Sequence, residues 1–344
     1  MSFFSDLFNK KEGGTVVLID ISANSIAGAY VRFTKDALPV LLYTHRIPIE
    51  VMEIEIEGRA MLRALKILGD TLIRDGAPML VRTVGSASVN NILVSIDAPW
   101  QKISVRTEYF EQNMPFIFNK SLVLAAMEKS SVVPKDHMLA DESVIGTILN
   151  GYETSDPYGK QAHRASIVIL TSLIDEEIAK GVNTILRSMY HTRNIVSIAG
   201  GSLHYQAMRI VFPHERDALI LDATGPLTSV LLVRRDLLTK VIEISTRTNN
   251  SATWLKEITD AFATLAGKFP LPRTIFLLAH EWDTARLRKA LDKAGLGKFW
   301  LSDNPPNIVS VLGSHISLFV RQTATEPSDL SLLLMALYYQ HHKA

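Results

Sequence analysis

Two aspartates stand at the same point of two similar stretches of this sequence. Asp20 ends an apolar run that starts at Val16, and Asp222 ends one that starts at Ala218. Each is followed by a turn of small residues and a second strand-like run. Carboxylates of this kind can hold Mg²⁺, which prefers oxygen ligands, while turn N–H groups can bind phosphate. Two interpretations stay open: a vestigial metal and phosphate site, or aspartates that only end strands and cap turns.

The composition and the absence of known motifs exclude several other kinds of site. The 344 residues include no cysteine, which excludes a thiolate zinc site, an iron–sulfur cluster, a disulfide framework and a cysteine nucleophile. No P-loop, dinucleotide-binding Gly motif or serine elbow occurs. Lys and Arg number 36 against 35 Asp and Glu, so we expect no nucleic-acid partner. The length suits two or three packed subdomains.

The N-terminus carries a short amphipathic arm at residues 1–14. Its apolar side chains fall on one helical face and two lysines follow, a pattern typical of a contact with a membrane interface or a partner. The alternative is an arm docked on its own domain. The residues concerned are Phe3, Phe4, Leu7, Phe8, Lys10 and Lys11. No apolar run is long enough for a transmembrane helix, and no signal peptide is recognisable, so we expect a cytoplasmic protein.

Hydrophobic periodicity predicts an α/β protein in which one pattern occurs twice. The first copy is a meander of three strands at 16–21, 26–33 and 38–49, followed by a helix at 58–74. The second is a meander at 218–222, 228–234 and 237–245, followed by a helix near 254–265. A strand at 274–279, a helix at 284–294 and a strand at 299–303 come next. Between the copies we expect strands at 89–96, 102–107, 143–152 and 166–171 and helices at 120–129 and 175–190.

Four segments resemble those of the actin-like ATPase superfamily, in its FtsA/PilM branch. FFSDLFNKKEGGTVVLIDISANSIAGAYV is similar to the arm and first phosphate loop of that branch, and ALILDATGPLTSVLLVRRDLL is similar to the second phosphate loop. LNGYETSDPYGKQAHRASIVILTS resembles the segment that leaves the inserted domain. TIFLLAHEWDTARLRKAL occupies the place of the adenosine loop.

The resemblance implies a two-lobed, ribonuclease H-like actin fold with a small SHS2-type α/β insert in the first lobe. It assigns the first lobe to residues 15–85 and 158–205, with a C-terminal helix at 328–344 packed on it. The insert is expected at 86–157 and the second lobe at 206–327. Nucleotide, if bound, would be held by Asp20, Ser22, Asn24, Ser25, Asp222, Thr224, Gly225 and Thr228, with Mg²⁺ on Asp20 and Asp222.

The phosphate loops depart from the family pattern where backbone must approach the nucleotide. Ser22 stands in place of a Gly, and Gly225 alone remains of the second loop's glycines. Pro226 has no N–H to donate, and Glu281 and Trp282 would crowd the purine. Each lost donor costs about 1.5–3 kcal/mol, as for hydrogen bonds to charged groups. We therefore expect weak or absent binding of ATP and Mg²⁺, and no required cofactor.

Two functional interpretations stay open. The first is an actin-like scaffold at the inner membrane face that recruits protein partners, either a pilus inner-membrane protein or a division protein, and that can self-associate. In PilM, by resemblance, a short peptide of such a partner lies in a groove of the inserted domain. The second is an active ATPase or sugar-kinase-type phosphotransferase of the same fold.

Overall fold

The structure is a computed structural model and describes residues 14–128, 133–154, 156–245, 251–300, 306–323 and 328–343. The expected N-terminal arm, with Phe3, Phe4, Leu7, Phe8, Lys10 and Lys11, lies outside these residues. In the described parts of the chain, no helix combines the length and the apolar character needed to cross a bilayer.

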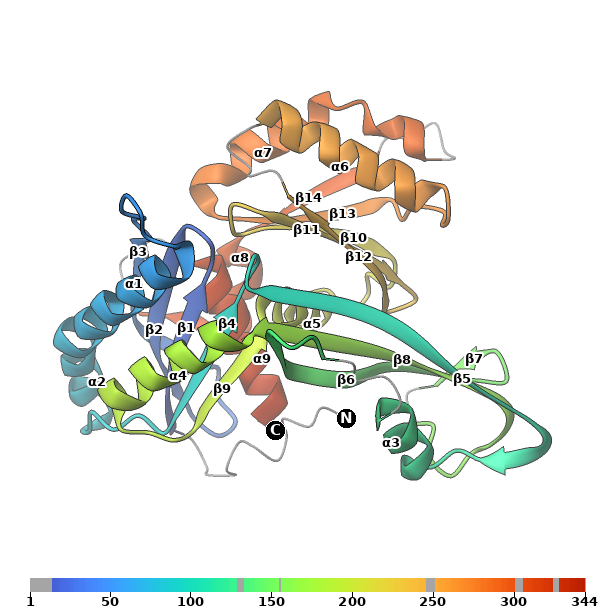
Figure 1. Ribbon diagram of the computed structural model, residues 1–344, viewed down its shortest axis with the longest axis horizontal. Coiled ribbons are helices and arrows are strands. Elements are labelled where there is room, and N and C mark those ends of the chain that lie inside the picture. The colour runs from blue at the N-terminus through green and yellow to red at the C-terminus, as the bar shows by residue number, and fades with distance from the viewer. Residues whose placement is uncertain are drawn as a thin grey trace.

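Two sheets form the two lobes, and five strands follow the same order in both, while the first sheet has one more strand at its edge (Figure 1). In each, three strands form an antiparallel meander, and two later strands run parallel to the first one. The first sheet contains, in spatial order, β15 (Arg321–Gln322), β3 (Val40–Pro48), β2 (Ser25–Phe33), β1 (Gly14–Ile21), β4 (Asn91–Ile96) and β9 (Ile195–Ala199). The second contains β12 (Leu237–Ile244), β11 (Thr228–Arg234), β10 (Ala218–Ala223), β13 (Thr274–Ala279) and β14 (Asn307–Val311). The duplication gives the two lobes that the sequence predicts.

Helices cover the outer faces of both sheets and fill the space between them (Figure 1). The first sheet carries α1 (Glu57–Thr71), a π-helical turn (Leu72–Gly76), α2 (Ala77–Val84) and α4 (Glu176–Tyr190). The second sheet carries α6 (Ser251–Ala266), α7 (Glu281–Lys293) and a 3₁₀ turn (Leu296–Phe299). Between the lobes lie α5 (Gly200–Val211), α8 (Gly313–Ile316) and α9 (Leu330–Lys343).

Local signals explain the best-predicted helix. The Asp175 carboxylate caps α4 by accepting a hydrogen bond from the Ile178 N–H at 2.9 Å. Glu176 and Glu177 follow in the first turn, where the helix dipole favours acids. Ile178, Val182 and Leu186 are buried against the first sheet.

A third sheet projects from the first lobe as the inserted domain (Figure 1). It contains β5 (Gln101–Ile117), β8 (Gln161–Asp175), β6 (His137–Leu149) and β7 (Tyr152–Glu153), with α3 (Lys120–Glu128) packed on one face. The expected insert boundaries, 86–157, are therefore wrong at both ends. The strand at 91–96 belongs to the first lobe, where it pairs with β1. The polar stretch near residue 161 begins β8, because that end of the strand is exposed and tolerates polar side chains.

The strand expected at 299–303 falls largely on residues 301–305, which are outside the described chain. A strand that the sequence did not predict follows at Asn307–Val311, after the Pro305-Pro306 pair, and pairs with β13. The pattern also missed β9 and α5, since five residues are too few for periodicity and a helix beginning Gly200-Gly201 violates helix propensity.

A single apolar core runs through both lobes. It joins Val16 and Leu18 of β1 to Ala218 and Ile220 of β10 through the buried faces of α5 and α9. In α9, residues 330–339 are all buried, as the expected C-terminal helix on the body requires. The lobes are consequently packed together through these two helices.

Truncation of the helix that joins the lobes should destabilise the whole chain. Leu334 of α9 is fully buried, so Leu334→Ala should lower the free energy of unfolding by about 2–5 kcal/mol. Leu318, whose exposed fraction is 77%, serves as the matched control, and Leu318→Ala should change it by less than about 0.5 kcal/mol. Urea unfolding followed by circular dichroism measures both. Equal effects of the two substitutions would contradict this packing.

Candidate functional site

The turns that follow the two aspartates meet between the lobes. A Cβ atom placed on Gly225 would lie 3.5 Å from the Cβ of Ser22, so the β10–β11 turn touches the β1–β2 turn. Asp97 follows β4 directly, and its N–H donates to the Ile21 carbonyl at 2.9 Å. Carboxylates from three strand ends therefore converge at the edge of parallel strands where α/β folds bind ligands.

Arg46 of β3 neutralises the first aspartate. Its guanidinium donates to Asp20 at 2.7 Å, to Asp329 at 2.6 and 3.0 Å, and to the Ser25 hydroxyl at 2.8 Å. Asp329 immediately precedes α9. Burial opposes the charge on both groups, but the attraction between them wins: it raises the pKa of Arg46 and lowers the pKa of Asp329. One side chain thus ties β1, β2 and the start of α9 together.

His204 of α5 neutralises the second aspartate. Its Nδ1 lies 2.6 Å from Oδ2 of Asp222, and both residues are buried. Burial disfavours the imidazolium, but the Asp222 charge and hydrogen bond raise the pKa of His204 to about 9. The same contact lowers the pKa of Asp222 despite its burial. The pair is therefore ionic at neutral pH.

Asp97 is the remaining carboxyl of the cluster. Burial, together with the charges of Asp20 and Asp222, raises the pKa of Asp97 well above its usual range. Oδ2 of Asp97, Oδ1 of Asp20 and Nε2 of His204 are buried and have no hydrogen-bond partner among the described residues. Like charges at close range favour the protonated form of one of the carboxyls, and the raised pKa makes Asp97 the group on which this effect falls.

The space left between the turns is small. The cavity beside Asp97, Gln101, Asp222, Gly225 and Leu227 holds about 10 Å³, roughly the volume that one water needs. Small-molecule sites in proteins measure about 300–1,000 Å³.

Hydrogen bonds within the turns use several of the donors that a phosphate would need. The Ser22 N–H donates to the Ser25 carbonyl at 3.0 Å, and the Thr224 N–H points to the Asp222 carboxylate at 3.3 Å. The Ser22 hydroxyl donates to the Asn24 side chain at 3.1 Å. Six of the eight expected nucleotide ligands therefore lie in or next to these turns and make hydrogen bonds within the chain, although Oδ1 of Asp20 has no partner among the described residues. The six are Asp20, Ser22, Asn24, Ser25, Asp222 and Thr224.

The other two expected ligands, Thr228 and Gly225, make different contacts. The Thr228 hydroxyl accepts a hydrogen bond from the Trp254 indole at 2.9 Å inside the second lobe, so Thr228 points away from the turns. Gly225 makes the contact with Ser22. At the expected adenosine loop, the Trp282 ring stacks on His280 at 4.4 Å between ring centres.

These residues do not fit Mg²⁺. A divalent cation on Asp20 and Asp222 would meet the guanidinium of Arg46 and the imidazolium of His204, which already compensate both carboxylates. Sequence reasoning missed both cations, because each reaches its aspartate through space from a separate element. An Arg in a largely apolar strand, VLLYTHRIP, was the one available signal for Arg46. No signal marked His204, since its helix was not recognised.

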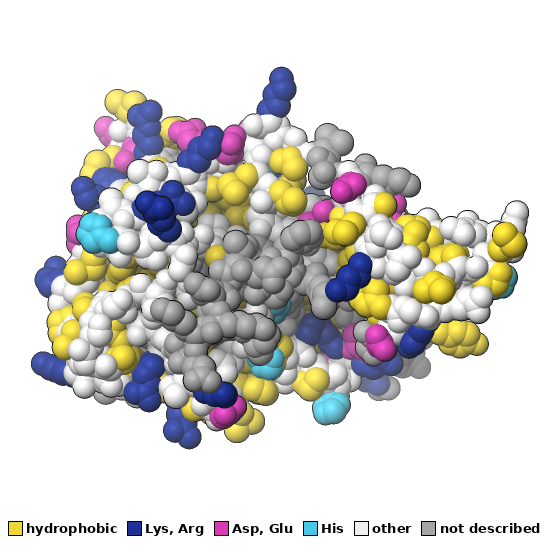
Figure 2. Space-filling model, turned by 90° about the horizontal axis from the view of Figure 1, so that it is seen from below, with side chains coloured by type: hydrophobic (Ala, Val, Ile, Leu, Met, Phe, Trp, Pro, Cys, Tyr) yellow, Lys and Arg dark blue, Asp and Glu magenta, His cyan; other side chains and the backbone are white. Residues whose placement is uncertain are grey.

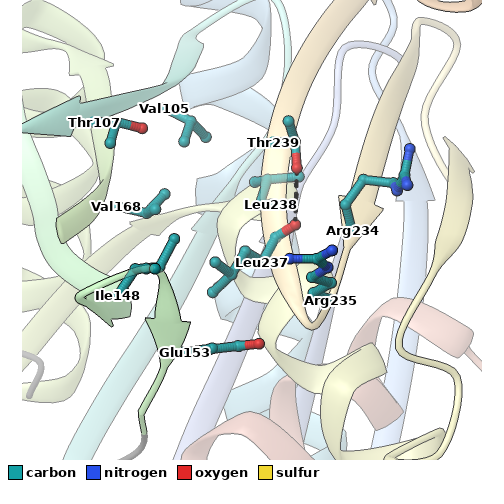
Figure 3. A pocket seen from close by; sticks show the side chains of 11 residues that line it. Val105, Thr107, Ile148, Glu153, Val168, Arg234, Arg235, Leu237, Leu238 and Thr239 are labelled. Atoms are coloured by element: carbon teal, nitrogen blue, oxygen red, sulfur yellow. Dashed lines mark hydrogen bonds between the residues drawn. The ribbon is translucent and has the colours of Figure 1, made fainter. Parts of the chain in front are cut away.

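A second candidate site lies between the inserted sheet and the second lobe. A cavity of about 150 Å³ lies there. Val105, Thr107, Ile148 and Val168 of the insert line one side of it (Figure 3). The β11–β12 hairpin, from Arg234 to Thr239, forms the opposite side. A groove of about 1,140 Å³ shares Gly151, Glu153, Arg235 and Leu237 with this cavity and continues along β6 and β7. The two together form an elongated depression, here called the insert groove.

A strained turn shapes one wall of the insert groove. Arg235 and Asp236 both have positive φ, 50° and 68°, a conformation that such hairpin turns normally assign to Asn-Gly. The Asp236 carboxylate is held by Arg209 and Arg216, and Arg216 also contacts Glu153 of β7 at 3.0 Å. The next residue, Leu237, packs where any side chain at Gly146 would collide with it. The hairpin is thus locked onto the insert beside the groove.

The far end of the insert exposes apolar side chains. Figure 2 shows them over the part of the molecule that projects from the lobes. They come from the outer half of β5 and from α3: Tyr109, Met114, Ile117 and Leu124.

Comparisons with known proteins identify the fold. Neither a protein-family model nor a curated protein matches this sequence. The chain is similar to a solved structure of the PilM–PilN type IV pilus biogenesis complex, with a TM-score of 0.59 and 13% identity over 97% of this chain and 98% of that one. A Bacteroides thetaiotaomicron protein with an actin-like ATPase fold and unknown function gives a TM-score of 0.48 at 9% identity, covering 98% of each chain.

The chain is also similar to the cytoplasmic domain of EpsL, an inner membrane component of the type II secretion system of Vibrio cholerae. That match has a TM-score of 0.42 and 8% identity, and it covers 95% of each chain. At such low identities the likeness establishes the fold alone. The chain has the actin-like ATPase fold over nearly its whole described length.

Removal of the Arg46 guanidinium should show how much the unfolding free energy falls when the buried carboxylates lose their cation. Arg46→Met leaves Asp20 and Asp329 unpaired, and we expect a loss of about 3–5 kcal/mol in unfolding free energy. Arg74→Met, at an exposed ion pair with Asp75, should cost less than about 1 kcal/mol. Chemical denaturation compares them, and adding Asp20→Asn to Arg46→Met should recover part of the loss. A cost for Arg46→Met no larger than that of the control would show that the carboxylates do not need this cation.

The His204–Asp222 pair should make stability fall with rising pH. The pKa of His204 is raised in the folded chain, so its contribution is complete below the unfolded value near 6.5 and is lost as pH rises through about 9. We expect unfolding free energy to fall by about 3 kcal/mol from pH 6 to pH 9. In His204→Gln this slope should vanish. A ¹⁵N NMR titration showing a neutral His204 ring at pH 7 would contradict the prediction.

Proposed function

We propose that this chain is a non-catalytic, actin-like scaffold that holds a segment of a partner protein in the insert groove. The observation that carries the proposal is the pairing of two side-chain cations, Arg46 and His204, with Asp20 and Asp222, the aspartates beside the two turns that meet between the lobes. About 10 Å³ remains beside these paired carboxylates, which is far less than the volume of an ordinary small-molecule site.

The insert groove has the properties of a peptide site. Its floor is formed by apolar and β-branched side chains of three neighbouring strands, including Val105, Ile148 and Val168. Arg235 and Glu153 lie at its edge and supply charge of both signs (Figure 3). Peptide grooves commonly combine apolar pockets that anchor side chains with a few polar groups that set orientation. The volume of the groove suits several residues of an extended chain.

The proposed partner is an inner-membrane protein of a pilus assembly system. The full-length match to a structure of the PilM–PilN complex supports this class over a division protein. The scaffold would then work at the cytoplasmic face of the membrane, where its partner is anchored. Whether the insert is of the SHS2 type and whether the chain self-associates stay predictions of the resemblance.

The nucleotide part of the proposal predicts no response to ATP. Titration with millimolar Mg²⁺–ATP should give no binding heat and no rise in melting temperature, because a ligand stabilises the state that binds it. Isothermal calorimetry and thermal unfolding measure the two effects. A micromolar dissociation constant would restore the alternative, an ATPase or sugar-kinase-type phosphotransferase.

The partner part is tested with a peptide from the N-terminal cytoplasmic segment of a PilN-type protein of the same organism. The wild-type chain should bind it, and Thr107→Lys, at an exposed position in the cavity, should weaken binding at least tenfold. Tyr109→Lys lies on the same strand outside the cavity and should have no effect. No binding to the wild-type chain, or equal binding to both variants, would exclude this groove as the site.

A further inference from the structure

The loop between β3 and α1 projects four apolar side chains into solvent. Val51, Met52 and Ile56 are at least half exposed, and Ile54 is 106% exposed relative to its extended reference. These side chains lie within six consecutive residues and belong to none of the four apolar clusters of the described structure. The loop, residues 49–56, is here called the β3–α1 loop.

Ile54 sits in a backbone conformation that suits it poorly. The Glu55 N–H donates to the Met52 carbonyl at 3.0 Å and closes a tight turn over residues 52–55. Ile54 is the third residue of that turn and has φ of +74°. Turns with positive φ at this position normally carry Gly or Asn, and a β-branched residue there is an outlier.

No packing within the described chain offsets the unfavourable backbone conformation of Ile54. A fully exposed side chain adds no packing, while Gly at the same place would relieve the backbone. Strained residues of this kind cluster at sites of binding and switching. An apolar side chain that is held outward at a conformational cost is best explained by an external contact.

The charge around the loop determines what can make that contact. Glu50, Glu53, Glu55 and Glu57 interleave with the apolar residues, and no Lys or Arg occurs between Arg46 and Arg59. Arg63 of α1 pairs with Glu55 at 2.8 Å and also donates to the Glu50 carbonyl, which fixes the loop on α1. Glu50 and Glu53 are exposed, one before Val51 and the other between Met52 and Ile54. A second copy of the loop, or an anionic lipid surface, would be repelled.

We infer that the β3–α1 loop is a docking site for a segment of a partner protein in which apolar side chains are flanked by Lys or Arg. The partner covers Ile54, Met52 and Val51, while its basic residues pair with Glu50 and Glu53. The surface lies on the first lobe and shares no residue with the insert groove. It is therefore a second contact, separate from the partner site proposed above.

A labelled twelve-residue peptide of alternating Leu and Lys serves as the probe, with fluorescence anisotropy as the readout. Burying one Ile side chain is worth a factor of ten or more in affinity. Ile54→Gly should weaken binding at least tenfold and leave the melting temperature unchanged or higher, because Gly relieves the turn. Glu53→Gln should weaken binding and reduce its dependence on salt.

Matched controls distinguish binding at the β3–α1 loop from nonspecific binding of the probe. Leu318→Ser removes another exposed apolar side chain, outside the β3–α1 loop, and should bind the probe as the wild type does. A peptide with Glu in place of Lys should not bind. Thr107→Lys, in the insert groove, should leave probe binding intact, so failure of the groove proposal and failure of this one are distinguishable.

Several outcomes would overturn the inference. Unchanged binding by Ile54→Gly would remove the loop from the contact, and a fall of several degrees in its melting temperature would show that Ile54 is structural. Sedimentation that finds a wild-type dimer and a monomeric Ile54→Gly variant would assign the loop to self-association. Loss of binding to anionic vesicles in that variant would assign it to a membrane.

Discussion

Buried carboxylates between the lobes are the constraint on which this structure depends. Asp20, Asp97, Asp222 and Asp329 lie out of water, where an unpaired charge is costly. Arg46 and His204 compensate three of them, and the raised pKa of Asp97 favours its protonated form. Because these cations come from β3 and α5 and their partners from β1, β10 and the start of α9, neutralising the site also fixes the lobes against each other.

The same arrangement links structure to function. In a nucleotide-driven fold the space between phosphate loops must open and close around a ligand and its metal. Here the two turns touch, and one apolar core runs through α5 and α9 into both sheets. This packing is consistent with the scaffold role proposed above. The surfaces that we propose for partner binding are the insert groove and the acidic, apolar β3–α1 loop.

Much of the fold follows from periodicity, and much of the site does not. The two meanders and their terminal aspartates were predictable, because alternation and turn residues are local signals. The capped helix α4 was predictable for the same reason. The insert boundaries were not, since β5 and β8 extend past the core to where polar side chains are tolerated. Arg46 and His204 could not be assigned to their aspartates without knowledge of which elements meet in space.

The central claim is that the side-chain cations Arg46 and His204 occupy the place where nucleotide and Mg²⁺ were expected from the sequence. A crystal structure of the chain grown with millimolar Mg²⁺ and a non-hydrolysable ATP analogue tests it most directly. The account predicts Arg46 between Asp20 and Asp329, His204 on Asp222, and no phosphate density between the two turns. Density for phosphates and a metal ion on Asp20 and Asp222, with Arg46 displaced, would contradict it.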